Sequence, residues 1–126
     1  MYSIVDVETT GGKYNEEGIT EIAIYKFDGI NIIDQFISLL NPEIPIQPFV
    51  QQLTGINNKM LTKSPKFFQV AKRILEITEN TILVAHNSSK VILYVDVLLR
   101  TEKYVSHNFN SISLSFNSIT FLTTFI

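Results

Sequence analysis

The chain has 126 residues and no cysteine, which excludes disulfide bridges and thiolate metal sites. Its formal net charge at pH 7 is −2, but residues 1–58 hold eight acidic and two basic side chains, whereas residues 59–103 hold eight basic and four acidic ones. The length fits one domain with its own core. Met1 leads straight into an apolar run without a signal-like region, and no stretch reaches the length of a membrane span, so we expect a cytoplasmic protein with no membrane contact.

Residues 2–7 form a short, β-branched run, which predicts a buried first strand. Asp6 and Glu8 lie two positions apart at its end, so their carboxyl groups share one face, roughly 7 Å apart, and can flank two divalent ions about 4 Å apart. Acids at a strand end often only cap a turn. Asp6, however, interrupts an apolar strand, where a buried charge needs a cation or a metal, and only Lys13 and Lys26 are basic in residues 1–58. We therefore interpret the pair as the outline of a metal site.

The next two runs predict a hairpin. Residues 19–27 and 30–40 are rich in apolar side chains and are joined across Asp28-Gly29, a strong two-residue turn signal. With the first strand they predict an antiparallel meander. Prolines then keep the chain extended, and residues 49–53 predict a short helix that ends at Gly55.

A longer amphipathic helix is expected to follow, with Ser64 as its N-cap and Pro65 at its first position. Residues 81–85 predict a fourth strand, which should pair parallel to an earlier one because it follows a helix. If it lies beside the first strand, His86 and Asn87 become neighbours of the acidic pair. The helix spacing divides its side chains into an apolar face, Phe67, Phe68, Val70, Ala71, Ile74, Leu75 and Ile77, and an outer face, Lys66, Lys72, Arg73, Glu76 and Glu79.

The basic half of the chain has two interpretations. Its side chains can meet phosphates of a nucleic acid, or they can form an ordinary solvated surface. The residues concerned are Lys59, Lys63, Lys66, Lys72, Arg73, Lys90, Arg100 and Lys103.

Three segments together resemble a known family. Residues 6–11 read Asp-Val-Glu-Thr-Thr-Gly, residues 53–56 read Leu-Thr-Gly-Ile, and residues 84–87 read Val-Ala-His-Asn. In this order and spacing they resemble the DEDD, or DnaQ-like, 3′-to-5′ exonucleases, in particular the proofreading exonuclease (epsilon) type of bacterial DNA polymerase III. The resemblance covers residues 1–87.

The resemblance implies a site and a reaction. Asp6 and Glu8 would hold two Mg²⁺ or Mn²⁺ ions for hydrolysis of the 3′-terminal phosphodiester of DNA, with a nucleoside monophosphate as product. Its implied partners are a single-stranded DNA 3′ end and a DNA polymerase subunit. For Leu53, which the family places near the terminal base, plain core packing is the alternative, and for His86 it is a structural histidine. The residues implied to contact the substrate or to hold the turn near it are Thr9, Thr10, Gly11, Leu53, His86 and Asn87.

The chain departs from the family after Asn87. The family continues with Phe-Asp where this chain has Lys90 and Val91, and the next aspartate, Asp96, is displaced by five residues, or roughly 140° of rotation on a helix. Asp96 is a catalytic candidate only if the residues before it loop out. We reject His107 as the family's general base, because no acidic residue follows it.

These observations predict an α/β fold, a ribonuclease H-like mixed sheet of three antiparallel strands and one parallel strand with flanking helices, truncated at its C-terminal end. Residues 1–103 are expected to form an incomplete exonuclease-like domain, and residues 104–126 an uncharged tail. Two explanations of the segment after Asn87 stay open, a shifted reading frame and a genuine short paralogue. The expected function is an impaired metal-dependent exonuclease, and the alternative is a non-catalytic module that binds nucleic acid or a polymerase.

Overall fold

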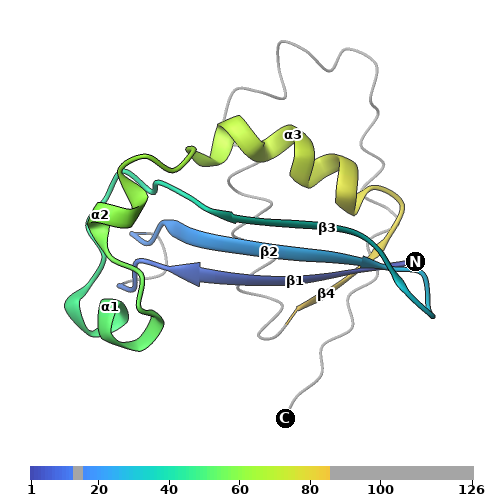
Figure 1. The fold of residues 1–126 in the computed structure, drawn as a ribbon, viewed down its shortest axis with the longest axis horizontal. Helices are drawn as coiled ribbons and strands as arrows, with labels where there is room; N and C mark the ends of the chain where they lie inside the picture. Colours follow the sequence, from blue (N-terminus) through green and yellow to red (C-terminus); the bar gives the residue numbers. More distant parts are fainter. Residues whose placement is uncertain (13–15, 86–126) are drawn as a thin grey trace.

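A four-stranded sheet runs through the computed structural model, which describes residues 1–12 and 16–85 (Figure 1). The strand order is β3-β2-β1-β4. In chain order the elements are β1 (Tyr2–Thr9), β2 (Ile19–Phe27), β3 (Ile32–Leu39), α1 (Pro48–Thr54), α2 (Asn58–Leu61), α3 (Phe67–Thr78) and β4 (Ile82–Ala85).

The pairing of the strands confirms the expected mixed sheet. β1 and β2 pair antiparallel, as do β2 and β3, and β4 pairs parallel to β1 with Ile82 opposite Tyr2 and Ala85 opposite Val5. α3 provides the crossover between β3 and β4, so the last strand lies beside β1 at the edge of the described sheet opposite β3. The chain leaves β4 at the same sheet edge at which β1 ends, as predicted.

α3 covers one face of the sheet (Figure 1). Strand side chains alternate between faces, so Val5 of β1 and Ile22 and Ile24 of β2 point toward the helix and are buried beneath it. The helix contributes one apolar stripe at intervals of three and four residues. Its buried members are Phe67, Ala71, Ile74 and Ile77.

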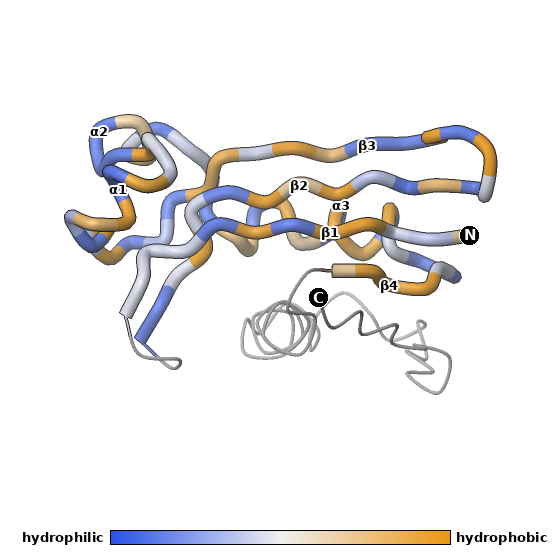
Figure 2. Tube along the Cα trace, turned by 90° about the horizontal axis from the view of Figure 1, so that it is seen from below, coloured by the Kyte–Doolittle hydropathy of each residue, from blue (hydrophilic) through white to orange (hydrophobic). Residues whose placement is uncertain are grey.

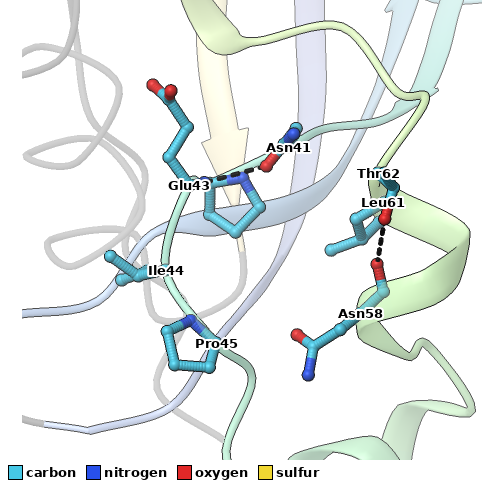
Figure 3. Close-up of a pocket in the computed structure, with 8 residues that line it drawn as sticks. Asn41, Glu43, Ile44, Pro45, Asn58, Leu61 and Thr62 are labelled. Carbon is cyan, nitrogen blue, oxygen red and sulfur yellow. Dashed lines mark hydrogen bonds between the residues drawn. The ribbon is translucent and has the colours of Figure 1, made fainter.

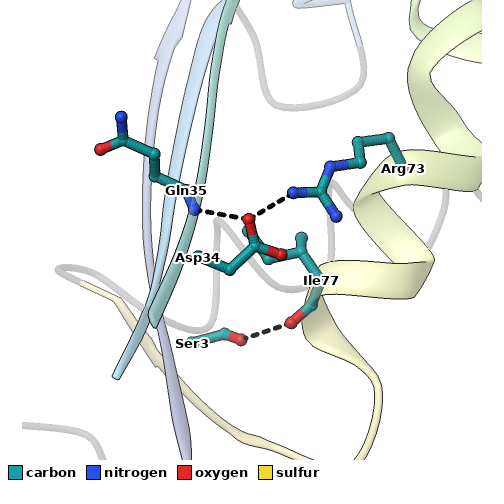
Figure 4. Close-up of polar contacts among 5 residues, drawn as sticks. All are labelled: Ser3, Asp34, Gln35, Arg73 and Ile77. Carbon is teal, nitrogen blue, oxygen red and sulfur yellow. Dashed lines mark hydrogen bonds and ion pairs between the residues drawn. The ribbon is translucent and has the colours of Figure 1, made fainter. Parts of the chain in front are cut away.

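Polar contacts fix α3 over the sheet (Figure 4). The Arg73 guanidinium donates to Asp34 Oδ1 of β3 at 2.5 Å, and the buried Ser3 hydroxyl of β1 donates to the Ile77 carbonyl at 3.2 Å. Thr81 donates in turn to Ser3 Oγ at 2.8 Å. Arg73, which the spacing assigned to the outer face, therefore lies between helix and sheet edge.

A second, smaller core holds α1 and α2 beyond the end of the sheet at which β1 terminates (Figures 1 and 2). It consists of four buried side chains, with Leu39 of β3 packed against them. They are Ile46, Val50, Ile56 and Leu61. Through Val50, this core holds α1 next to the loop that follows the acidic motif.

Several predicted element bounds differ from the structure, and one short helix was not predicted. β3 begins at Ile32, because Asp28 Oδ1 accepts hydrogen bonds from the Ile30 and Asn31 amides at 2.7 Å and extends the turn. α1 begins at Pro48, although it ends at Gly55 as expected. The four-residue helix α2 was not predicted, since it is too short to show a periodic pattern.

The predicted start of the long helix is also wrong. α3 begins at Phe67 with Lys66 as its N-cap, not at Ser64 and Pro65. The Ser64 amide donates to the Leu61 carbonyl and closes α2, while the Pro65 carbonyl accepts from the Asn41 amide at 2.8 Å. Both residues are therefore already engaged by neighbouring segments.

The face of the sheet opposite α3 exposes apolar side chains within the described residues. Tyr2 and Ile4 of β1 are 39% and 43% exposed, and Ile33 and Ile37 of β3 are both 51% exposed. Of the helices in residues 1–12 and 16–85, none has the length and apolar character needed to cross a membrane.

Candidate active site

The acidic pair lies on β1, on the sheet face opposite α3. β1 continues through Thr9, so Asp6 and Glu8 stand inside its last four residues and not at its end as predicted. The buried Ser3 and Val5 point toward the helix, and the alternation of the strand places both carboxyl groups on the other side.

Asp6 is exposed, not buried in the sheet centre as the sequence argument assumed. The cost of a buried charge is therefore no evidence for a metal at this position. The support for a metal comes instead from the grouping of like charges on one face.

A third acid lies beside the pair. Glu21 of β2 stands directly opposite Glu8 in the antiparallel ladder, so the two side chains are neighbours on one face. Partial burial raises the pKa of Glu8, and the negative charges of Asp6 and Glu21 raise it further. The face therefore holds negative charge that a bound cation would relieve.

Sequence reasoning missed Glu21. Its position within an apolar run was visible, but its pairing with Glu8 depends on the register set by the connection from residue 10 to residue 18. That register includes an irregularity between Glu8 and Thr9, which period-two alternation does not reveal.

The donor chemistry of the pair fits a hard divalent cation. Carboxylate oxygens are the ligands that Mg²⁺ and Mn²⁺ prefer. Within residues 1–12 and 16–85, however, no three or more acidic or histidine side chains come together closely enough to enclose an ion. The described part of the chain thus offers Asp6 and Glu8 as two ligands of a site that needs further donors.

The residues after the pair form a loop held by its own hydrogen bonds. The buried Thr10 accepts from the Gly18 amide through Oγ1 at 3.0 Å, and its own amide donates to the Gly18 carbonyl at 2.9 Å. The Thr9 hydroxyl donates to Glu17 Oε2 at 2.8 Å. Both threonines therefore fix the shape of the loop, and their contact with a nucleotide stays a prediction.

Gly11 brings α1 against this loop. It has φ +71°, and a Cβ at this position would lie 2.5 Å from Val50 Cγ2 and 3.2 Å from Phe49 Cζ. The Gln47 amide also donates to the Thr10 carbonyl at 2.9 Å. Only glycine allows both this backbone conformation and this approach, so the motif's glycine positions the helix.

Leu53 lies on α1 with 81% of its surface exposed, which makes the core-packing interpretation wrong. Gly55 ends the helix with φ +74°, and its amide donates to the Gln51 carbonyl. The family-like segment at residues 53–56 thus presents an apolar side chain to solvent near the acidic motif.

The remaining predicted site residues lie outside the described residues. These are His86, Asn87 and Asp96, together with Lys90, Val91 and the rejected His107.

Figure 3 shows a pocket of about 260 Å³ whose lining does not include Asp6 or Glu8. It is formed by residues 41–45 and by α2, and Asn41 Oδ1 accepts from the Glu43 amide at its rim at 2.9 Å. Of the predicted site residues that the structure describes, none lines this pocket. Its lining residues are Asn41, Pro42, Glu43, Ile44, Pro45, Asn58, Leu61 and Thr62.

A mixed sheet in this order, with paired carboxylates on its central strand and a helix locked to the following glycine loop, defines a ribonuclease H-like nuclease fold. The RNase T exonuclease family model matches residues 3–122. The chain belongs to this exonuclease family.

Two curated relatives support the assignment. The 3′-5′ exonuclease DinG of Staphylococcus aureus (strain bovine RF122 / ET3-1) is 41% identical over 86 residues, which are 68% of this chain and 10% of the relative. The PolC-type DNA polymerase III of Caldanaerobacter subterraneus subsp. tengcongensis is 36% identical over 88 residues, or 70% of this chain and 6% of the relative. The chain thus spans a tenth or less of these proteins.

Solved structures agree on the fold. Exonuclease X in complex with 5′ overhanging duplex DNA gives a TM-score of 0.58 at 28% identity, with 75% of this chain and 53% of that chain covered. The nuclease domain of 3′hExo, a DEDDh family member bound to rAMP, gives a TM-score of 0.63 at 23% identity, with 79% and 57% covered. The second likeness concerns the fold alone.

Proposed function

We propose that this chain is a metal-dependent 3′-to-5′ exonuclease domain that acts on single-stranded 3′ ends of DNA. The observation that carries the proposal is the pair Asp6 and Glu8 on the exposed face of the central strand, in a chain of the exonuclease family. Partial burial, and then the negative charges of Asp6 and Glu21, raise the pKa of Glu8, and this grouping of negative charge on one face favours a bound cation.

The described residues have separate tasks in this proposal. Asp6 and Glu8 would hold Mg²⁺ or Mn²⁺, which when bound activates a water and stabilises the departing 3′ oxygen. Thr10 and Gly11 keep α1 at a fixed position beside the carboxylates. Leu53, exposed on that helix, then meets the terminal nucleotide.

Hydrolysis is expected to be slow and to favour Mn²⁺. The chain has Lys90 and Val91 where the family continues with Phe-Asp, and no acidic residue follows His107, so a positioned general base would be missing. Such a loss typically costs about 10²- to 10⁴-fold. Asp96 is the only aspartate after residue 34, and we propose it as a further acidic ligand.

We propose a DNA polymerase as partner, and the likeness to a PolC-type DNA polymerase III supports this proposal. The alternative, a binding module that relies on the basic half, receives less support. Lys66, Lys72 and Arg73 already form ion pairs with Glu43, Glu76 and Asp34, respectively.

The test is digestion of a 5′-labelled single strand with Mn²⁺, with Mg²⁺ and with a chelator. We expect stepwise shortening from the 3′ end that requires metal and is abolished in Asp6→Asn and Glu8→Gln. Glu76→Gln is the matched control, since it removes an exposed carboxylate on α3. Metal-dependent activity that survives Asp6→Asn would overturn the site. DNA binding that ignores metal but falls steeply with salt would favour the module.

A further inference from the structure

Two lysines at α2 differ from the other basic side chains of the described residues. Lys59 and Lys63 are exposed, and within residues 1–12 and 16–85 neither of them forms an ion pair or a hydrogen bond. The other basic side chains of these residues form ion pairs with carboxylates or donate to a backbone carbonyl. They are Lys66, Lys72 and Arg73, which form ion pairs, and Lys26, which donates to the carbonyl. The two positive charges at α2 are therefore available to a ligand.

The segment that carries these lysines contains no acidic residue. Residues 44–65, which include α1 and α2, have no aspartate or glutamate, whereas residues 1–43 hold eight. Glu43 lines the pocket beside α2, but its carboxylate is already paired with Lys66 at 2.6 Å. Both helices lie together beyond the sheet end at which β1 terminates (Figure 1). A basic, acid-free segment thus adjoins the end of the strand that carries the acidic pair.

Hydrogen bonds hold the two lysines in a fixed relation to the start of α1. The Ile46 amide donates to Asn58 Oδ1 at 3.0 Å, and the Thr62 hydroxyl donates to the Asn58 carbonyl at 3.1 Å. Thr62 keeps helical dihedral angles, φ −56° and ψ −35°, so the helical turn continues to Lys63. Residues four apart lie on the same side of a helix. The side chains of Lys59 and Lys63 therefore extend from one side of α2.

The second core links α2 to the loop beside the carboxylates. Leu61 of α2 and Val50 of α1 belong to this core, and Val50 also packs against Gly11. α1 has seven residues, so it is about 10 Å long, which corresponds to about three phosphate spacings of a stacked strand. A strand whose 3′ end lies at Asp6 and Glu8 and which runs along α1 thus brings its upstream phosphates to α2.

We propose that Lys59 and Lys63 bind phosphate groups of the substrate strand upstream of its 3′-terminal nucleotide. This inference rests on the proposed exonuclease function and adds two positioning residues to it. Lysine side chains that neutralise backbone phosphates strengthen binding of a nucleic acid without reading its sequence. Because these contacts lie upstream of the cleaved bond, they act only on strands that are long enough to reach α2.

The test measures how binding depends on salt, with the full chain. Fluorescence anisotropy is recorded with a labelled single strand of about ten nucleotides at several salt concentrations, with Ca²⁺ in place of Mg²⁺ to slow hydrolysis. The double variant Lys59→Gln, Lys63→Gln should bind this strand more weakly. The slope of log K against log salt concentration should fall by about 1.4, because each phosphate contact on a single strand contributes about 0.7. Binding of a labelled strand of about two nucleotides should be unchanged.

Three controls separate phosphate binding from a structural effect. The double variant Lys59→Arg, Lys63→Arg keeps both charges and should keep the salt slope of the wild type. Lys72→Gln removes an exposed lysine of α3 that is paired with Glu76, and it should leave the slope unchanged. The circular dichroism spectrum and melt of the double glutamine variant should match the wild type, because both lysines are exposed.

The outcomes distinguish this inference from the function on which it depends. If the wild type binds or digests 3′ ends but the double glutamine variant keeps the salt slope, or weakens binding of long and short strands equally, the phosphate contacts are wrong and the exonuclease proposal stands. If the wild type neither binds nor digests any 3′ end with metal present, both proposals are overturned.

Discussion

Gly11 is the residue on which the geometry of the candidate site depends most directly. Gly11→Ala should destabilise the chain by about 2–4 kcal/mol, because a left-handed backbone costs a side-chain-bearing residue roughly 1–2 kcal/mol and the new methyl group must displace Val50. α1 should shift away from the carboxylates, so 3′-end binding should fall as well. Chemical denaturation measures the loss of stability, and fluorescence anisotropy with a labelled single strand measures the loss of 3′-end binding.

Gly55→Ala is the matched control for this prediction. Gly55 has a similar φ of +74°, but nothing lies within 4 Å of a Cβ placed on it. It should therefore show the backbone strain alone and lose about 1–2 kcal/mol. Equal losses for the two variants would contradict the claimed contact between Gly11 and Val50.

At the residue scale, local patterns predicted the face shared by Asp6 and Glu8 but not its third acid. Two residues two apart on one strand must share a face, whatever the rest of the fold does. Glu21 joins them only through the pairing of β2 with β1, and the exposure of Asp6 depends on what covers the sheet. Neither the pairing of Glu21 nor the exposure of Asp6 can therefore be predicted from the residues of the motif alone.

At the element scale, the contact between α3 and β3 depends on one ion pair at the sheet edge (Figure 4). The hydrogen bond from Arg73 is the largest cause that holds the pKa of Asp34 below its usual value. A carboxyl group with a lowered folded-state pKa stabilises the fold above its unfolded-state pKa, near 4, and this stabilisation is lost as the pH falls through the lowered value. Asp34→Asn should therefore lower Tm at pH 7, and the difference from wild type should disappear at acidic pH, below the lowered pKa of Asp34.

Glu76→Gln is again the control, because its ion pair with Lys72 is exposed and longer, at 3.8 Å. Its Tm should match that of the wild type at both pH values, since such surface pairs contribute little. A Tm difference for Asp34→Asn that persisted at low pH would show that packing, and not the charge, stabilises this contact.

The start of α3 shows why element boundaries are harder to predict than elements. The apolar spacing of the helix depends on its own residues, and it was found correctly. Ser64 and Pro65 have the local preferences of a helix start. The Ser64 amide, however, donates to a carbonyl of α2, and the Pro65 carbonyl accepts from the Asn41 amide. Lys66 caps instead, with its amide donating to Gln69 Oε1 at 2.8 Å.

At the scale of the whole molecule, the strand order followed from general rules. A short turn favours an antiparallel pair and a helical crossover favours a parallel one, so the mixed sheet could be predicted without a structure. These rules do not predict what covers the face of the sheet opposite α3, where Ile4 and Ile37 are exposed among the described residues. A third ligand and a base for the proposed site would have to come from beyond the described residues 1–12 and 16–85.

The whole chain should be stabilised by the ions that its acidic face is proposed to hold. A ligand that binds only the folded state at about ten times its dissociation constant adds about 1.4 kcal/mol, which appears as a higher Tm with Mn²⁺ than with a chelator. The effect should depend on pH. Because the pKa of Glu8 is raised, its carboxyl group stays protonated in the folded state at pH values above the usual pKa range of glutamate. The contribution of Glu8 to stability therefore falls as the pH rises through the raised pKa.

Bound Mn²⁺ offsets the loss of stability that ionisation of Glu8 causes, because the ion binds the ionised carboxylate and neutralises its charge. The increase in Tm should therefore be larger at about pH 7.5 than at about pH 5, where protons compete for Glu8. Asp6→Asn should remove the increase at both pH values, while Glu76→Gln should keep it. An increase that is independent of pH and survives Asp6→Asn would place the ion elsewhere on the molecule and separate metal binding from the acidic pair.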